Sequence, residues 1–394
     1  MNLQHLKGYF DYNATTPISE GVALSMQPAI NLFANPSSPN RYSVNSRATI
    51  SQARDNIADL LSTDAKKIFF TSGGSEANNW ALKGVLFKHL SNPGHIITSS
   101  MEHPSVLDTV RYCVEELGFR ATYLQPDAAG HIKISDFESA LTSDTQLISV
   151  MYANNETGAI QPIEQLCSIA AEHKIPVHVD AVQFVGKRLI DVELLGVDYL
   201  SLSAHKFYGP KGVGCLYIKD KDAIGPLIHG GGQELSMRSG TENLVAMSGI
   251  SVAAEEANRQ LVYWDSHCFR LKKQMMDLLE AAPIALAFNG ATDYESALSN
   301  TLNISIDGIR GEALALRLEM LHGFIISVGS ACSNNKTKHL SHVLMAMGLT
   351  EERVLGAIRI SFGCFTDAQQ VSKFVDALVI EVQQLLHISG CETL

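Results

Sequence analysis

Several sequence signatures of common protein classes are missing from this chain of 394 residues. No apolar run is long enough to span a membrane, and the start MNLQHLKGYFDYN lacks the charged and apolar regions of a signal peptide. The seven cysteines are odd in number and form no CxxC pair, which argues against a disulfide framework. We therefore expect a protein without membrane contact that works in a reducing compartment, the cytoplasm.

The signatures of metal and nucleotide sites are missing as well. The 14 histidines include no HExxH, and no Cys/His cluster has the spacing of metal ligands, so we expect no metal. A Walker Gly-Lys-Ser/Thr and a GxGxxG fingerprint are both absent, which argues against a P-loop enzyme and a nicotinamide oxidoreductase. The net charge of −11 argues against direct binding of nucleic acid, because a phosphate backbone requires a basic surface.

Short β-branched runs that alternate with helical stretches are what the sequence does contain. The runs are KKIFFTS, GHIITSS, QLISVMY, PVHVDAV, DYLSLSA and VGCLYIK, and the amphipathic stretches include 75–90, 104–117 and 162–174. This alternation predicts an α/β domain with a mainly parallel sheet and helices on both faces. After a glycine-rich segment at 225–242 and a long helix at about 243–280, the runs TLNISIDG, GFIISVGS and AIRISFG predict a smaller α+β domain.

In such sheets, ligands bind beyond the carboxyl ends of the strands, and polar residues follow several of these strands. In TSGGSEANN (71–79), glycines turn the chain into a helix that begins at Ser75, and the free N–H groups of its first turn favour an anion such as phosphate. The alternative is an ordinary strand–helix turn with Ser75 as its N-cap. His103 in MEHPSV could stack on a planar ligand, although taken alone it fits an ordinary surface histidine better.

Two further strand ends carry a carboxylate and an amine. Asp180 ends an apolar strand in PVHVDAVQFVG, so it needs a partner such as a protonated pyridine nitrogen or an arginine, and Gln183 lies one helical turn further on. Lys206 in SLSAHKFYGPKG follows an apolar run together with Ser203 and His205. A desolvated lysine has a lowered pKa and becomes a nucleophile towards aldehydes, whereas an exposed loop lysine in an ion pair is the alternative.

Together these pieces form the set of groups that pyridoxal 5′-phosphate (PLP) requires. They are an anion cradle, an aromatic platform, a carboxylate for a ring nitrogen and a lysine for an aldehyde. One cysteine stands apart from them, because Cys332 in VGSACSNN lies among small and polar residues that are typical of a loop. By itself such a thiol could be a bystander, half a disulfide, a metal ligand or a nucleophile.

The sequence resembles the NifS-like cysteine desulfurases, PLP enzymes of the class V aminotransferase group with fold type I. The resemblance runs from YFDYNATTP at 9–17 to AIRISFG at 357–363, and it includes NPSS, TSGGSEANN, EH, NNETG, HVDAVQ, SAHKFYGPKGVG, RSGTEN and SVGSACS. It implies a mainly parallel seven-stranded sheet in a large PLP-binding domain at 15–260. Residues 1–14 and 261–394 would form a small α+β domain that carries the catalytic cysteine loop.

The resemblance also implies roles for residues in these motifs. Lys206 would hold the cofactor covalently, Asp180 would pair with its ring nitrogen and Gln183 with its ring hydroxyl. His103 would stack on the ring and serve as acid or base near the substrate sulfur. The phosphate would be held by Gly74, Ser75, Ser203 and His205.

Further residues would serve the substrate and a second subunit. Arg359 and Asn154 would orient the substrate, Arg359 through its carboxylate, with help from Asn35; Asn154 would also contact the cofactor. Thr241 in RSGTEN would reach the phosphate of the neighbouring subunit's cofactor, which implies a homodimer. Cys332 would attack the sulfur of L-cysteine and carry it as a persulfide, leaving L-alanine.

The resemblance leaves the substrate and the sulfur acceptor open. A selenocysteine lyase acting on L-selenocysteine, an aminotransferase, and a sulfur-carrier docking protein with a degenerate site are the competing readings. Cys332 argues against plain transamination, and the intact motifs argue against degeneracy. The acceptor would be an iron–sulfur scaffold or a thiolation enzyme. The run SNNKTKHLSHVL after Cys332 and the short tail depart from the housekeeping pattern and favour a specialised route such as tRNA or DNA thiolation. Asn40 in NPSSPN stands where many relatives have histidine, and this difference touches none of the assigned catalytic roles.

Overall fold

A seven-stranded sheet forms the centre of the larger part of the molecule in this computed structural model, which describes residues 6–332 and 338–389. Its strands are β1 (Ile68–Thr71), β2 (His95–Ser99), β3 (Arg120–Leu124), β4 (Thr145–Met151), β5 (Val177–Asp180), β6 (Tyr199–Ser203) and β7 (Gly214–Ile218). They lie in the order β1-β7-β6-β5-β4-β2-β3, and only β7 runs antiparallel to its neighbours. The predicted α/β class with a mainly parallel sheet is confirmed, and β3 is a strand that the sequence patterns missed.

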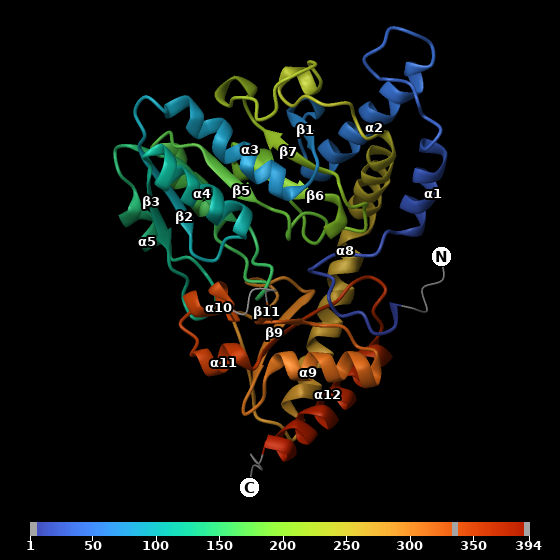
Figure 1. Ribbon diagram of the computed structural model, residues 1–394, viewed down its shortest axis with the longest axis vertical. Coiled ribbons are helices and arrows are strands. Elements are labelled where there is room, and N and C mark those ends of the chain that lie inside the picture. The colour runs from blue at the N-terminus through green and yellow to red at the C-terminus, as the bar shows by residue number, and fades with distance from the viewer. Residues whose placement is uncertain (1–5, 333–337, 390–394) are drawn as a thin grey trace.

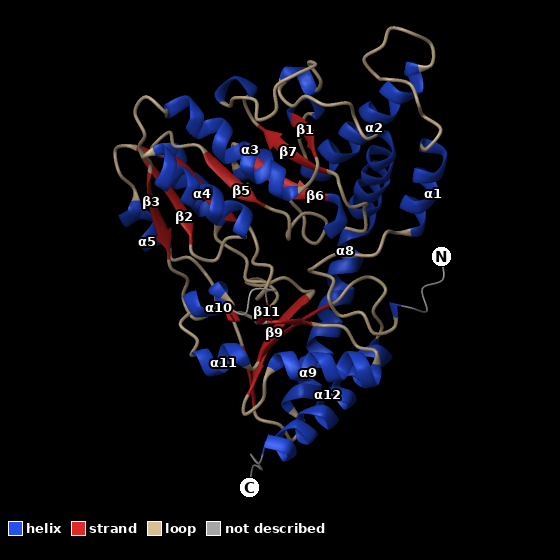
Figure 2. Ribbon diagram, in the orientation of Figure 1, coloured by secondary structure: helices blue, strands red, loops and turns tan. Residues whose placement is uncertain are grey.

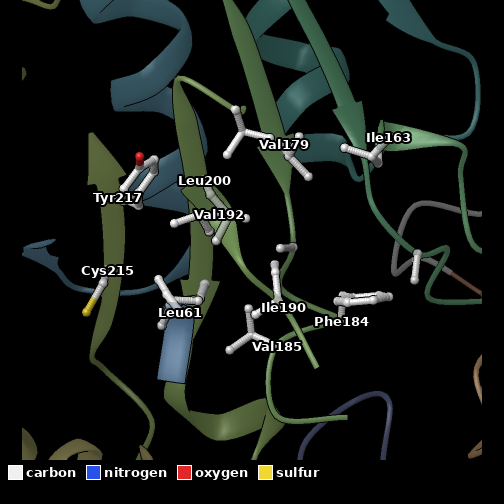
Figure 3. Packing of buried hydrophobic residues seen from close by; sticks show 14 of the residues in the cluster. Leu61, Ile163, Val179, Phe184, Val185, Ile190, Val192, Leu200, Cys215 and Tyr217 are labelled. Atoms are coloured by element: carbon white, nitrogen blue, oxygen red, sulfur yellow. The ribbon is translucent and has the colours of Figure 1, made fainter. Parts of the chain in front are cut away.

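Helices cover both faces of this sheet, as Figure 2 shows by colour. The helices of this part are α1 (Glu20–Ala29), α2 (Ser43–Leu61), α3 (Gly74–Leu86), α4 (Pro104–Leu117), α5 (Ile134–Ala140), α6 (Ile163–Glu172) and α7 (Val192–Leu195). Successive strand residues divide between the two faces, because side chains alternate along a strand. Phe69 packs in the cluster under α3 and α4, whereas Phe70 packs in the cluster on the opposite face, part of which Figure 3 shows.

A four-stranded antiparallel sheet forms the smaller part, in the order β10-β13-β9-β8. Its strands are β8 (Leu286–Phe288), β9 (Thr301–Ile306), β10 (Ser327–Val328) and β13 (Ala357–Ser361). The helices are α9 (Gly311–Arg317) with the π-helical turn Leu318–His322, α10 (His342–Ala346), α11 (Glu351–Leu355) and α12 (Ala368–Ser389). The expected strand in GFIISVGS is shorter than predicted, because it is divided between β10 and a hairpin of β11 (Ser330–Cys332) and β12 (Lys338–Leu340).

The two parts share one long helix and the start of the chain. Helix α8 (Leu244–Glu280) packs on α1 and α2 in the larger part and on α12 in the smaller, so the predicted domain boundary at 260 falls inside a continuous helix (Figure 1). Tyr9 and Asp11 form bridges with Ile325 and Ser361, which places this segment of the chain beside the small sheet. The division into two domains stays a prediction.

Neither a membrane span nor a metal cluster occurs in the described part of the chain. None of its helices is long and apolar enough to cross a membrane. No group of three or more His, Cys, Asp or Glu side chains within residues 6–332 and 338–389 is arranged to hold a metal ion. The cysteines whose side chains are described are free thiols: Cys113, Cys167, Cys215, Cys268 and Cys364.

Candidate active site

A cavity of about 330 Å³ opens where the carboxyl ends of β4, β5 and β6 face the small sheet. A volume of this size suits a small organic ligand. Of the thirteen residues predicted for the site, nine line the cavity: Gly74, Ser75, His103, Asp180, Gln183, Ser203, His205, Lys206 and Arg359. The cavity therefore gathers groups that are spread from residue 74 to residue 359 of the chain.

Lys206 lies in the short 3-10 turn Ala204–Lys206 directly after β6. Its Nζ donates to the carbonyl oxygens of Asn13, at 2.6 Å, and Ala14, at 2.9 Å. Burial lowers the pKa of Lys206 to about 8, and the positive charge of Arg359 acts in the same direction. An amine with this pKa is partly uncharged near neutral pH, which is the state that reacts with an aldehyde.

Asp180 ends β5 and is almost completely buried. Its two carboxylate oxygens accept from Asn78 Nδ2, at 2.7 Å, and from the backbone N–H of Val182, at 3.0 Å. These donors are neutral, and within residues 6–332 and 338–389 no cationic side chain forms an ion pair with this carboxylate. A protonated ring nitrogen of a ligand would supply a cationic partner.

His103 caps the N-terminus of α4, which begins at Pro104. Its Nδ1 accepts from the backbone N–H of Ser105, at 3.1 Å, so the neutral ring carries its proton on Nε2. Burial lowers the pKa of His103, against the opposing effect of Asp180. The imidazole is therefore neutral near pH 7, and it can stack on a ring or exchange a proton at Nε2.

An anion cradle lies at the other end of the cavity, at the N-terminus of α3. Gly74 and Ser75 begin this helix, whose first N–H groups are free to bind an anion. A Cβ at Gly74 would lie 2.6 Å from Val182 Cγ2, so only glycine fits there without movement. Ser203 and His205 approach from the end of β6, and burial lowers the pKa of His205 to about 4, so this histidine is a neutral hydrogen-bonding group.

The residues present fit PLP. The cradle suits its phosphate, Asp180 suits its pyridine nitrogen and the Lys206 amine suits its aldehyde, and all of them line one cavity. An oxygen of Asn78 supports this reading, since its buried Oδ1 has no hydrogen-bond partner among the described residues.

Arg359 lies on β13 and brings the small sheet to the cavity. Its Nη2 donates to Asp11 Oδ1, at 2.5 Å, and to Ser327 Oγ, at 2.7 Å, and its Nη1 donates to the carbonyl oxygen of Asn155, at 3.1 Å. Its buried Nε has no partner in the described part of the chain. The guanidinium is held in a fixed orientation and suits a carboxylate ligand.

Asn154 does not lie where the resemblance implies. Its side chain is fully buried, its Oδ1 accepts from the N–H groups of Glu156 and Thr157, and its Nδ2 donates to the carbonyl of Met101. An amide that closes a turn in this way cannot also orient a substrate, and the next residue, Asn155, lines the cavity instead. We therefore correct the assignment from Asn154 to Asn155.

Three other predicted residues are not brought into this cavity. Asn35 lies exposed in the loop between α1 and α2, where its Oδ1 accepts from the N–H of Ser37, and Thr241 is exposed before α8. Cys332 ends β11 opposite Lys338, but its side chain lies outside the described part of the structure. Cys391, the other thiol in a polar sequence, also lies outside the described residues.

The sequence patterns missed four residues that shape the site. Asn13 and Asn78 bind Lys206 and Asp180, and Asn155 receives Arg359. Glu102 is fully buried behind His103, where its Oε1 accepts from Ser99 Oγ and the N–H of Met151. All four lie in the quoted motifs DYNATTP, TSGGSEANN, EH and NNETG, but only their spatial contacts reveal what each one binds.

Comparison with known proteins agrees with this geometry. The sequence model of the family described as aminotransferase class-V matches residues 8–374. A curated relative named cysteine desulfurase IscS, from Clostridium botulinum, is 39% identical over 97% of this chain and 96% of its own length. Another of that name, from Dictyoglomus turgidum, is 41% identical over the same shares.

Solved structures show the same relationship. A structure named NifS-like protein superposes with a TM-score of 0.89 at 36% identity, over 96% of this chain and 100% of the other. A structure described as SspA in complex with cysteine superposes with a TM-score of 0.79 at 39% identity, over 91% of this chain and 100% of the other. The chain therefore belongs to the aminotransferase class-V family and, within it, to the PLP-dependent cysteine desulfurases.

Proposed function

We propose that this enzyme converts L-cysteine to L-alanine and takes the sulfur onto Cys332 as a persulfide. The observation that carries the proposal is that one cavity presents a partly uncharged lysine, a buried carboxylate and an anion cradle, with Arg359 at its small-domain side. The solved relative described as a complex with cysteine supports this substrate.

In this proposal, the protein's own residues bind the substrate and move its protons. Arg359 binds the carboxylate of L-cysteine. Its bonds to Asp11 and Ser327 hold the guanidinium in a fixed position, so the substrate is bound in a fixed orientation. When bound, PLP supplies an electron sink that stabilises negative charge at the α-carbon and weakens the bond from Cβ to sulfur. Lys206 Nζ removes the α-proton, and the Nε2 of His103 exchanges a proton with the substrate sulfur.

Cys332 completes the reaction as a thiolate nucleophile. Its sulfur forms a bond with the substrate sulfur while the bond from that sulfur to Cβ breaks, and the electron pair stays with the carbon. Protonation of that carbon gives L-alanine, and Cys332 retains the persulfide. The position of β10 supports this role, because Ser327 binds Arg359 and lies five residues before Cys332, a span of at most about 17 Å.

The base of the Cys332 hairpin is fixed to the large-domain side of the cavity, which also supports its role. Ser341 follows β12, and its Oγ donates to Glu156 Oε2 at 2.5 Å. The next residue, His342, has its Nε2 at 2.9 Å from the carbonyl oxygen of Glu102. These two bonds hold the base of the hairpin beside the cavity, which is where a nucleophile on this hairpin is needed.

We further propose that the enzyme is a homodimer in the cytoplasm. The exposed loop between α1 and α2 carries large apolar side chains, among them Phe33, which is 83% exposed, and Ile30, which is 70% exposed. An exposed apolar patch of this kind is typical of a subunit interface. A second copy of the chain that packs on it would bring Thr241 or Asn35 to the cavity of the neighbouring subunit. A reactive thiol such as Cys332 needs the reducing cytoplasm to stay free.

The persulfide sulfur then passes to an acceptor protein, either an iron–sulfur scaffold or a thiolation enzyme. The run SNNKTKHLSHVL, which follows Cys332, departs from the housekeeping pattern, and this departure favours the thiolation enzyme.

The test is to incubate the purified holoenzyme with L-cysteine and a thiol reductant, and to measure alanine and sulfide together. We expect equal amounts of both, because the reductant releases the persulfide sulfur as sulfide. Cys332→Ala should keep its full content of PLP and lose sulfide release, whereas Cys364→Ala, a matched change of a free thiol, should keep both. Sulfide release by Cys332→Ala at the wild-type rate would show that the persulfide mechanism is wrong.

A further inference from the structure

Asn13 lies at the junction of the two sheets, and all of its polar groups are engaged. It is 1% exposed, and it belongs to the segment that bridges to the small sheet at Asp11. Burying a polar group without a hydrogen bond costs free energy of folding. A buried residue whose polar groups are all paired therefore restricts the positions of its partners. Asn13 was described above only as the acceptor of Lys206, and its other contacts show a wider role.

The backbone carbonyl of Asn13 holds two groups of the cofactor cavity. Its oxygen accepts from Lys206 Nζ, at 2.6 Å, and from Gln183 Nε2, at 2.9 Å. A carbonyl oxygen has two lone pairs, and these two donors use both of them. Any rotation of the Asn13 peptide therefore moves the acceptor of Lys206.

The side chain of Asn13 closes a ring with Lys187 and Gln183. Lys187 Nζ donates to Asn13 Oδ1, at 3.0 Å, and to Gln183 Oε1, at 2.7 Å, while Gln183 Nε2 returns to the Asn13 carbonyl. This ring determines which end of the Gln183 amide faces which partner. Asn13 thus acts on two predicted cofactor contacts through separate atoms.

Most of the remaining bonds of Asn13 reach the small sheet, and one goes from its Nδ2 to the carbonyl oxygen of Asn155, at 3.1 Å. Asn13 Nδ2 donates to Thr301 Oγ1 at 2.8 Å, and Asn300 Nδ2 donates to Asn13 Oδ1 at 2.9 Å, both at the start of β9. The backbone N–H of Asn13 donates to Ser361 Oγ, at 3.0 Å, at the end of β13. The small sheet thereby determines the orientation of the peptide that holds Lys206.

We propose that Asn13 is a positioning residue that couples the seating of the small domain to the orientation of Lys206 and Gln183. The inference rests on the proposed role of Lys206 in holding PLP. It also explains why a neutral amide suits the position. A carboxylate at residue 13 would face Lys187 directly and lie near Lys206, so it would favour the charged form of both amines, whereas burial lowers the pKa of both in the native protein.

A small second cavity of about 30 Å³ agrees with this electrostatic argument. It lies behind the two amines, and its walls include Lys187, Lys206, Tyr208 and Trp264. Asp265 also lines it, and the aromatic side chains place apolar surface beside the amines, where a nearby charge has a stronger influence than in water.

The test is the rate at which the apo-protein captures PLP covalently, measured against pH after borohydride reduction. The variants are Asn13→Asp, Asn13→Ala and a matched control, Asn303→Ala. Asn303 is an equally buried asparagine on β9 that donates to the carbonyl of Glu156 across the same interface but does not bind Lys206. The thermal unfolding midpoint of each apo-protein reports stability separately.

We expect Asn13→Asp to move the midpoint of the capture profile up by about one pH unit, because a nearby carboxylate favours the charged amine. Asn13→Ala should capture PLP at least about tenfold more slowly at every pH, because the peptide that holds Lys206 loses its anchors. Asn303→Ala should lose stability and keep the wild-type profile. If Asn13→Ala does not fold, the nearly isosteric Asn13→Asp carries the test.

A wild-type midpoint in Asn13→Asp, or the same profile in Asn13→Ala and Asn303→Ala, would overturn the inference. Failure of the proposed function is a different outcome, because it would appear as covalent capture by Lys206→Ala at the wild-type rate.

Discussion

The two walls of the cavity are built in different ways. On the large-domain wall, Asp180 and Lys206 follow strands of one sheet, and Ser75 lies in the first turn of the helix after β1, so local backbone structure places them. On the small-domain wall, Arg359 comes from a separate sheet, and contacts with distant segments such as Asp11 place it. The first wall is therefore local in sequence, and the second depends on how two parts of the molecule pack.

This difference predicts that substitutions on the two walls fail differently. Loss of a group on the large-domain wall should abolish cofactor attachment and the chemical step. Loss of a group on the small-domain wall should leave the cofactor bound and weaken the binding of substrate. Three measurements examine this contrast, beginning with the largest expected effect.

Lys206→Ala should remove the covalent attachment of PLP and lower alanine formation by at least about 10⁴-fold, because no other amine replaces the nucleophile and base. The measurement is the mass of the borohydride-reduced protein together with the rate of alanine formation. Lys221→Ala, which removes an exposed lysine from the short turn after β7, should resemble the wild type in both. A reduced PLP adduct on Lys206→Ala would contradict the assignment.

Arg359→Lys should lower kcat/KM for L-cysteine by about 100-fold, mainly through KM, because lysine cannot bind a carboxylate through two parallel bonds. The content of PLP should stay at the wild-type level, since Arg359 lies on the other wall. Arg317→Lys is the matched control, because Arg317 also lies in the smaller part of the molecule and pairs with a buried carboxylate, Glu381. Loss of PLP from Arg359→Lys would contradict the prediction that substitutions on this wall leave the cofactor bound.

The smallest effect concerns stability against pH behind the large-domain wall. Burial raises the pKa of Glu102 to about 8, although bonds from Ser99 and Met151 oppose the rise. The folded protein therefore retains a proton that the unfolded chain releases near pH 4.5, and stability is lost as pH rises from about 4.5 to about 8. The midpoint temperature of unfolding should therefore fall less in Glu102→Gln than in the wild type when the pH is raised from 6 to 8.5.

Glu381, in the smaller part of the molecule, should change stability with pH in the opposite direction to Glu102. Burial acts to raise the pKa of Glu381, but His322 and Arg317 outweigh it and hold the pKa below its usual value. Its contribution to stability is present above the unfolded pKa and disappears as pH falls. Glu381→Gln should therefore be destabilised at neutral pH and approach the wild type in acid, and a shared trend in the two variants would contradict these pKa directions.

Sequence patterns predicted the large-domain wall better than the small-domain wall. All six expected strands of the large sheet are present, and so are helices in the three expected stretches 75–90, 104–117 and 162–174, because an apolar run with a polar end specifies a strand and its ligand-facing end locally. Strand β3 was missed because its sequence, RATYL, is polar and partly exposed. The pattern predicted GFIISVGS as one strand, whereas the chain leaves the small sheet after Val328 to form the hairpin that carries Cys332.

The sequence by itself determined the fold class, the family and the residues at the strand ends, since the alternation of apolar and polar residues and the motif chemistry are properties of neighbouring residues. Only the tertiary structure decided between Asn154 and Asn155, which are adjacent and identical in the NNETG motif. Asn154 closes a turn with its side chain, whereas Asn155 lines the cavity. It alone also revealed Asn13 as the acceptor of Lys206, a contact between residues 193 positions apart. Such a contact depends on how the two sheets pack against each other, and no local pattern records that packing.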